Sequence, residues 1–195
     1  MSISAIILSG GRATRMNGVD KGLVLLQSKS LIQHVIERLT RQVDEILINA
    51  NRELAQYQAL GYPVLQDEVE DFLGPLAGFS LGLQHAQHDY VLTVPCDSPL
   101  LPVDLAQRLM AALVENKAEI AVASSDGSTH PVFCLCKETV LPSLTAYLQQ
   151  GERRVSTWQK SLQYIEVDFS DRNEAFTNLN TFEDLAVLEA ALNNT

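Results

Sequence analysis

The sequence is short of basic residues, and it has no long apolar segment. Its 195 residues include 14 Lys and Arg against 24 Asp and Glu, which gives a formal net charge of −10. An acidic protein repels nucleic acids and anionic membranes, so we expect neither as a partner. No apolar run reaches the roughly 20 residues that a membrane-spanning helix needs. A polyanionic substrate would therefore have to meet the few basic residues concentrated at one place.

Cysteines are also scarce, and their number is odd. Cys96, Cys134 and Cys136 fit neither a disulfide framework nor a four-ligand zinc site. The apolar segment 131–136 predicts a strand, in which alternation places Cys134 and Cys136 on one face. We therefore expect plain core thiols and a reducing, cytoplasmic compartment. The apolar N-terminus lacks a basic leader and is typical of a first strand rather than a secretory signal.

Apolar strands alternate with amphipathic helices along the chain, whose hydrophobic content of 46% suffices for a sizeable core. The predicted strands span residues 3–8, 45–48, 64–65, 90–94, 120–123, 132–135 and 164–169. The predicted helices span residues 31–39, 52–60, 75–86, 102–115, 141–149 and 181–192. This order predicts a single α/β domain over residues 1–195, with three layers around a mostly parallel, doubly wound sheet. Ligands of such sheets bind beyond the carboxyl ends of the strands.

Glycines and basic residues follow the first predicted strand. Gly10 and Gly11 let backbone N–H groups approach an anion, and Arg12, Arg15 and Lys21 add three positive charges within ten residues. The segment contains neither a Walker A motif nor a Gly-x-Gly-x-x-Gly fingerprint. It predicts a phosphate-binding loop, and the alternative is a flexible loop with solvated charges.

Polar or small residues follow the next strands. The amide of Asn49 is suited to reading a base or a ribose, whereas we interpret Asn51 as a helix N-cap. A lone carboxylate such as Asp67 is most often a turn or cap residue. The small residues of 74–78 would let a helix approach a phosphate or base, or would simply pack closely.

A second acidic residue, Asp97, lies between Pro95 and Pro99 at the end of the strand 90–94. The prolines stiffen this turn. A rigid carboxylate at this edge suits Mg²⁺, which takes one or two carboxylates and substrate phosphate oxygens. The alternative is an Asx-turn.

Together these motifs resemble a known family. Leu8-Ser9-Gly10-Gly11, Arg15-Met16 and Asp20-Lys21-Gly22 are similar to the signature of GT-A-like, Rossmann-related nucleotidylyltransferases. The whole chain resembles the molybdenum cofactor guanylyltransferases. The supporting segments, in order, are 49–51, 74–78, 95–99, 130–131, 151–155 and 178–181. The resemblance implies transfer of GMP from GTP to the terminal phosphate of molybdenum–molybdopterin, with release of pyrophosphate.

The resemblance also implies residue roles, with residues 1–100 as the nucleotide-binding half and 101–195 as the molybdopterin-binding half. Leu8, Ser9, Gly10, Lys21, Asn49, Asp67 and Asp97 match GTP-contacting positions of the family, and we add Gly11, Arg15 and Gly78 as expected GTP contacts. Asp97 is also the expected Mg²⁺ ligand, and Arg15, Lys21 and Asp97 are the expected catalytic residues. The chain departs from the family pattern at Ser9, where alanine is commoner, and at Asn17, where glycine usually stands.

The second half is expected to hold the pterin. Arg153 and Arg154 follow a glycine and suit the cofactor phosphate, although adjacent arginines also occur on solvated helix starts. Asn178 and Asn180 share one side of an extended segment, and their amides are able to pair with pterin edges. His130 is either a substrate contact or a structural residue.

This reaction needs no general base, because a phosphate monoester with a second pKa of about 6 is already ionised. It needs charge neutralisation at the phosphates instead. Three alternatives remain open: a cytidylyltransferase for the same cofactor, a sugar-phosphate nucleotidylyltransferase and a non-catalytic delivery protein. Expected partners are GTP, molybdenum–molybdopterin and, transiently, cofactor-insertion and molybdoenzyme delivery proteins. A monomer is compatible with the sequence, which leaves the oligomeric state open.

Overall fold

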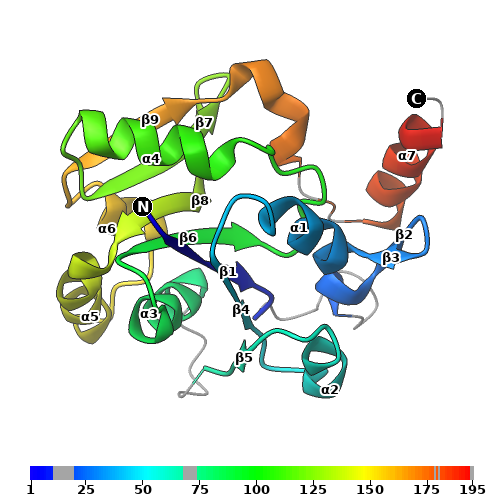
Figure 1. The fold of residues 1–195 in the computed structure, drawn as a ribbon, viewed down its shortest axis with the longest axis horizontal. Coiled ribbons are helices and arrows are strands. Elements are labelled where there is room, and N and C mark those ends of the chain that lie inside the picture. The colour runs from blue at the N-terminus through cyan, green and yellow to red at the C-terminus, as the bar shows by residue number, and fades with distance from the viewer. Residues whose placement is uncertain (11–19, 68–73, 178, 180, 194–195) are drawn as a thin grey trace.

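The computed structural model describes residues 1–10, 20–67, 74–177, 179 and 181–193 (Figure 1). Its strands are β1 (Ile3–Leu8), β2 (Leu25–Leu26), β3 (Lys29–Ser30), β4 (Glu45–Asn49), β5 (Val64–Leu65), β6 (Tyr90–Pro95), β7 (Ile120–Ser125), β8 (Ser128–Lys137) and β9 (Tyr164–Asp168). Its α-helices are α1 (Leu31–Leu39), α2 (Leu54–Gln58), α3 (Pro75–His85), α4 (Leu105–Glu115), α5 (Leu141–Gln149), α6 (Val155–Gln159) and α7 (Phe182–Asn193). The 3₁₀ helices are η1 (Lys21–Leu23), η2 (Glu138–Val140) and η3 (Ser170–Phe176).

Seven strands form one sheet in the order β5-β4-β1-β6-β8-β7-β9. Strand β8 is antiparallel to β6 and β7, and the other neighbours pair in parallel. The predicted mostly parallel sheet is therefore confirmed. The reversal at β8 arises because only Asp126 and Gly127 connect it to β7, and so short a loop can join only antiparallel strands. Both connecting residues have positive φ (47° and 73°), as a tight hairpin turn requires.

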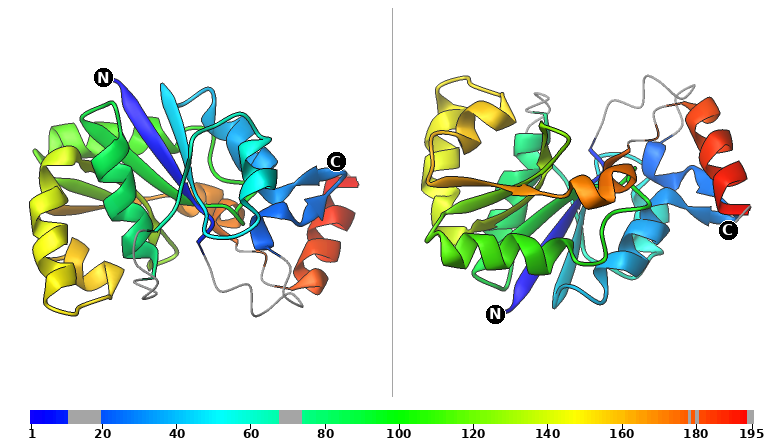
Figure 2. Two further views of the ribbon diagram at one scale, coloured as in Figure 1. Left: turned by 90° about the horizontal axis from the view of Figure 1, so that it is seen from below. Right: turned by 90° about the horizontal axis from the view of Figure 1, so that it is seen from above.

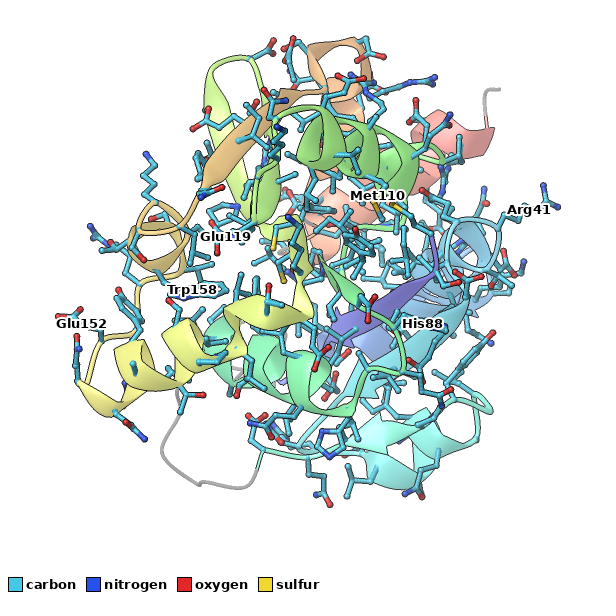
Figure 3. The ribbon with its side chains drawn as sticks, turned by 60° about the vertical axis from the view of Figure 1, so that its left-hand side comes forward. Arg41, His88, Met110, Glu119, Glu152 and Trp158 are labelled. Carbon is cyan, nitrogen blue, oxygen red and sulfur yellow. The ribbon has the colours of Figure 1, made fainter. Side chains whose placement is uncertain are left out.

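Helices cover both faces of the sheet, which gives the three predicted layers (Figure 2). Alternation along β1 divides its side chains between them: Ile7 joins the core under α1 and α4, and Ile6 joins the core under α3 and α5. Trp158, labelled in Figure 3, extends from α6 into the second core. Its ring meets Phe79 of α3 edge-on, with centroids 6.0 Å apart.

The last helix, α7, lies apart from the sheet beside β2 and β3 (Figure 1). Its start matches the prediction, since Thr181 and Asp184 exchange backbone-to-side-chain hydrogen bonds of 2.9 and 3.1 Å. Leucines of α7 pack against Leu26 and Leu179 in a separate small core. The C-terminal helix is thereby held beside the segment that follows η1.

Several sequence predictions needed correction. Helix α2 begins at Leu54 and not at residue 52, because Glu53 adopts a left-handed conformation (φ 49°), and it ends at Gln58 and not at residue 60. Helix α4 begins at Leu105 and not at residue 102, and β8 extends well beyond 132–135. The β2–β3 ribbon, α6 and the 3₁₀ helices were not predicted. All three cysteines are free and buried, and Cys134 and Cys136 face the same core, as predicted.

No helix in the part of the chain that the structure describes has the length and apolar character to cross a membrane.

Candidate functional site

The carboxyl ends of three neighbouring strands form one edge of the sheet. The Ser9 N–H donates to the Asn49 carbonyl (2.8 Å), and the Cys96 N–H donates to the Leu8 carbonyl (3.2 Å). These bonds continue the ladders of β4, β1 and β6 beyond the last paired residues. Ser9, Asn49 and Asp97 are thereby fixed at the same edge, which is where ligands of such sheets bind.

Two amides hold the Asp67 carboxylate at this edge. Asn49 Nδ2 donates to Asp67 Oδ1 (2.9 Å), and Asn51 Nδ2 donates to Asp67 Oδ2 (2.7 Å). The Asp67 backbone N–H donates in return to Asn51 Oδ1 (2.8 Å). Both carboxylate oxygens are therefore oriented, and the end of β5 is tied to the end of β4.

Glycines on two sides lie against Asn49. A Cβ added at Gly10 would lie 3.0 Å from Asn49 Oδ1, and one added at Gly78 would lie 2.7 Å from the same atom. The Gly78 Cβ would also collide with a methyl group of Leu8. Because Asn49 Nδ2 is directed to Asp67, its Oδ1 faces the backbone of the two glycines. The close-packing interpretation of residues 74–78 is thus supported at Gly78.

At the same edge of the sheet, Lys21 and Asp97 form a largely buried ion pair. Lys21, the first residue of η1, extends its ammonium to Asp97 Oδ2. The two side chains are 25% and 13% exposed. The Asp97 carboxylate thus already faces a positive charge where a cation is expected, and the Lys21 ammonium lies at the sheet edge.

Asp20, the residue before Lys21, is hydrogen-bonded to Tyr57 in the interior. Tyr57 is fully buried, and its hydroxyl donates to Asp20 Oδ1. The same carboxylate oxygen accepts the Gly22 N–H (3.3 Å) and so caps η1. Burial raises the pKa of Asp20, and the Tyr57 and Gly22 hydrogen bonds oppose that shift.

The Cys96 thiol is buried beside Asp97. Burial, together with the Asp97 charge, raises the pKa of Cys96 to about 12. A protonated thiol is a poor nucleophile, so Cys96 acts as a packing residue.

The donor set at this edge fits Mg²⁺ bound with substrate. Across residues 1–10, 20–67, 74–177, 179 and 181–193, no group of three His, Cys, Asp or Glu side chains is arranged as a closed metal site. Asp97 offers one carboxylate that already has a cationic neighbour. Mg²⁺ commonly takes one or two carboxylates and completes its shell with phosphate oxygens and water.

Comparison with known proteins gives the family. The model of the MobA-like NTP transferase domain matches residues 5–163. The chain belongs to this family. A molybdenum cofactor guanylyltransferase of Polynucleobacter asymbioticus is 50% identical over 195 residues, which cover 98% of each chain. One from Shewanella sp. (strain MR-4) is 49% identical over 193 residues, covering 99% of this chain and 98% of the relative.

Solved structures share the fold of this NTP transferase domain. Molybdopterin-guanine dinucleotide biosynthesis protein A from Archaeoglobus fulgidus superposes with a TM-score of 0.79 at 20% identity, covering 98% of this chain and all of that one. A 4-diphosphocytidyl-2C-methyl-D-erythritol synthase from Anaerococcus prevotii gives 0.76 at 14% identity, covering 98% of both chains. At these identities the likeness concerns the fold alone. It confirms the predicted α/β nucleotidyltransferase architecture.

The edge formed by the carboxyl ends of β4, β1 and β6 brings most of the predicted nucleotide contacts together. These are Leu8, Ser9, Gly10, Lys21, Asn49, Asp67, Gly78 and Asp97. Gly11, Arg15, Asn178 and Asn180 lie outside the described residues. The roles of all these residues stay predictions.

Arg153 and Arg154 lie on the exposed turn between α5 and α6, next to Glu152 in Figure 3. Arg153 Nη1 donates to the carbonyls of Leu148 (2.9 Å) and Glu152 (2.7 Å). In this structure Arg153 therefore closes the end of α5, and Arg154 precedes the first residue of α6. The structure thus gives Arg153 a role at the end of a helix. The binding of the cofactor phosphate by Arg153 and Arg154 stays a prediction.

One backbone contact links the C-terminal segment to the same edge of the sheet, which is called the nucleotide edge below. The Leu179 N–H approaches the Asp97 carbonyl at 3.4 Å. Nearby in sequence, Phe176 stacks on the ring of His130 with centroids 4.4 Å apart, and His130 Nε2 lies 2.7 Å from Ser125 Oγ. Burial lowers the pKa of His130, which favours the neutral ring. These contacts support the structural interpretation of His130.

Two site features were not predicted. The N-cap interpretation of Asn51 is wrong, because its side chain binds Asp67 and α2 begins only after Glu53. The two-residue spacing of Asn49 and Asn51 was an available signal, since alternate residues of an extended strand share a side. The Asp20–Tyr57 contact spans 37 residues and has no local signal.

Proposed function

We propose that this chain transfers GMP from GTP to the terminal phosphate of molybdenum–molybdopterin, releasing pyrophosphate and forming the guanine dinucleotide cofactor. The observation that carries the proposal is the Lys21–Asp97 pair beside Asn49 and Asp67, at the sheet edge of a MobA-like domain. Guanylyltransferase relatives about 50% identical over the whole chain support the same activity.

In the proposed reaction, an oxygen of the acceptor phosphate attacks the α-phosphorus of GTP. The new P–O bond forms as the bond to the β-phosphate oxygen breaks, and pyrophosphate leaves with that electron pair. The acceptor is already ionised near neutral pH, so no residue has to remove a proton. The work of the chain is to bring two polyanions together and to neutralise their charge.

Lys21 would supply positive charge at this edge, and its ion pair with Asp97 supports that role. Its partner Asp97 is the residue that would hold Mg²⁺, which when bound would neutralise phosphate charge. In the absence of substrate each member of the pair neutralises the other. We infer that the triphosphate takes over the ammonium, and that Arg15 adds a second positive contact.

Leu8, Ser9, Gly10, Gly11, Asn49, Asp67 and Gly78 would surround the nucleoside and its phosphates. Asn51 joins them as the partner of Asp67. The second half, residues 101–195, would hold the pterin through Arg153, Arg154, Asn178 and Asn180. The contact of Leu179 with the Asp97 carbonyl supports this arrangement, because it places the C-terminal segment beside the nucleotide edge.

The proposal extends to partners and location. GTP and molybdenum–molybdopterin are the substrates, and cofactor-insertion and delivery proteins would bind transiently. Residues 1–195 would act as one catalytic domain. The monomeric state and the cytoplasmic location stay predictions.

The test is nucleotide choice in a turnover assay. Purified protein, Mg²⁺ and molybdenum–molybdopterin are incubated with each of the four NTPs, and the pterin dinucleotide is detected by mass. Product with GTP alone is expected. Product with CTP alone would overturn the specificity, and no product while the Polynucleobacter relative works would overturn the activity.

A lysine comparison connects the assay to the site. Lys21→Ala should lower kcat by about 10²–10³, the usual cost of losing one contact to transition-state charge. Lys29→Ala is the matched control, since Lys29 forms an exposed surface pair with Glu37. Near-normal turnover by Lys21→Ala would refute the role of Lys21.

A further inference from the structure

Helix α2 contributes one buried side chain to the molecule. It spans only Leu54–Gln58, and Tyr57 alone among these residues is buried, with no exposed surface. A tyrosine hydroxyl in the interior needs a hydrogen-bond partner. The partner here is Asp20, a carboxylate that is itself only 6% exposed.

Asp20 in turn organises η1. Its carboxylate accepts the Gly22 N–H, and its carbonyl accepts the Leu23 N–H (3.0 Å). Lys21 lies between Asp20 and Gly22, which this hydrogen bond joins. The direction in which its side chain leaves the backbone therefore depends on how Asp20 is held.

The backbone of η1 also lies directly against the tyrosine. A Cβ added at Gly22 would lie 2.6 Å from Tyr57 Oη and 3.3 Å from the Cβ and Sγ atoms of Cys96. Cys96 is the residue before Asp97. The 3₁₀ turn thus packs closely against both the tyrosine hydroxyl and the strand end that carries the partner of Lys21.

We propose that Tyr57 is a positioning residue for phosphate transfer: its hydroxyl, acting through Asp20, holds η1 so that the Lys21 ammonium lies at the nucleotide edge. The inference rests on the proposed GMP transfer. Tyr57 touches neither substrate nor metal in this scheme, and its effect on the reaction passes through Lys21.

The first variant is Tyr57→Phe, which keeps the buried ring and removes only the hydroxyl. We expect kcat to fall about 10-fold, less than for Lys21→Ala because the ammonium is still present. The KM for GTP should change less than kcat, since the other nucleotide contacts remain. Tyr164→Phe is the matched control: it removes another tyrosine–carboxylate bond, to Glu166 (2.8 Å), on β9. Its kcat should equal that of the wild type.

A double variant separates positioning from general structural support. If Tyr57 acts through Lys21, then adding Tyr57→Phe to Lys21→Ala should lower kcat by less than about 2-fold, because contributions made through one group are not additive. A full further 10-fold loss would overturn the proposal. So would a wild-type kcat in Tyr57→Phe alone.

Folding is monitored with the single tryptophan, Trp158, which is fully buried. If Tyr57→Phe does not fold, Asp20→Asn replaces it, because it removes the carboxylate that accepts the Tyr57 hydroxyl. The kcat of Asp20→Asn is then compared with that of the wild type, and the kcat of the Asp20→Asn, Lys21→Ala double variant with that of Lys21→Ala. Wild-type protein that is inactive with all four nucleotides would overturn the proposed function together with this inference. Active wild-type protein with an unaltered Tyr57→Phe would overturn this inference alone.

Discussion

Gly78 and Gly82 offer a comparison of two glycines on one helix, one at the proposed site and one in the core. Both lie on α3 and face β1. A Cβ at Gly78 would lie 2.7 Å from Asn49 Oδ1, and a Cβ at Gly82 would lie 2.7 Å from Ile6 Cγ2. Substitution by alanine therefore introduces a collision at both positions, but only Gly78→Ala meets proposed GTP contacts, namely Asn49 and a methyl group of Leu8.

The stability change should be small and alike in the two variants. Overpacking a core costs about 1–3 kcal/mol. Alanine regains about 1 kcal/mol of that through its better helix propensity. The net cost of about 0–2 kcal/mol corresponds to a fall in Tm of up to about 8 °C for a chain of this size.

GTP binding should distinguish the two variants. Displacing Asn49 disturbs its own ligand contact and also its hydrogen bond to Asp67. Loss of about 1.4 kcal/mol, near the value of one hydrogen bond, raises Kd about 10-fold. We expect this for Gly78→Ala by calorimetric titration, and less than a 2-fold change for Gly82→Ala. Equal weakening in both variants, at matched Tm, would refute the assignment of Asn49.

Three further predictions address neighbouring groups. Asn51→Ala frees one Asp67 oxygen, so the Kd for GTP should rise about 5-fold in the same titration, at the value of roughly one hydrogen bond; an unchanged Kd would contradict the role of Asn51. Chelation of Mg²⁺ should abolish turnover by the wild type, and Asp97→Asn should require far more added Mg²⁺ for any activity; an identical Mg²⁺ requirement would exclude Asp97 as the ligand. Because burial raises the pKa of Asp20 above 3.8, wild-type stability relative to Asp20→Asn should fall as pH rises from about 3.8 through the raised pKa and then level off, in urea titrations. A difference that grows with pH would contradict the sign of this shift.

Local periodicity made much of the fold predictable. The bounds of β1, α1 and α5 agree with the sequence prediction residue by residue. In α1 the buried positions follow a helical repeat, and Gln33 caps its start by accepting the Ser30 N–H (2.8 Å). In such an amphipathic helix the repeat and the capping residues mark the first and last residues, so these bounds were predictable from the local sequence.

Features that depend on pairing between distant segments were not predictable in the same way. The direction of β8 is a different case, because it follows from a local signal, the Asp126-Gly127 turn, which the prediction of the strands did not use. The helix-end role of Arg153 is also local, since its partner Leu148 lies only five residues away, but an exposed arginine has many possible partners. The partners of Asn51 and Asp20 come from other strands and helices, so a propensity argument assigned Asn51 to a cap instead.

The charges at the sheet edge explain how an acidic chain could accept a triphosphate. Among the residues that the structure describes, three carboxylates at or behind this edge are held by donors: Asp97 by Lys21, Asp67 by two amides and Asp20 by Tyr57 and Gly22. Oriented donors take up charge that would otherwise face an incoming anion. The Lys21–Asp97 pair joins two full opposite charges, so in the proposed reaction a phosphate and a divalent cation would divide this pair between them. Under this proposal the response to substrate would pass through one ion pair, and the buried Tyr57–Asp20 contact would fix the position of its lysine.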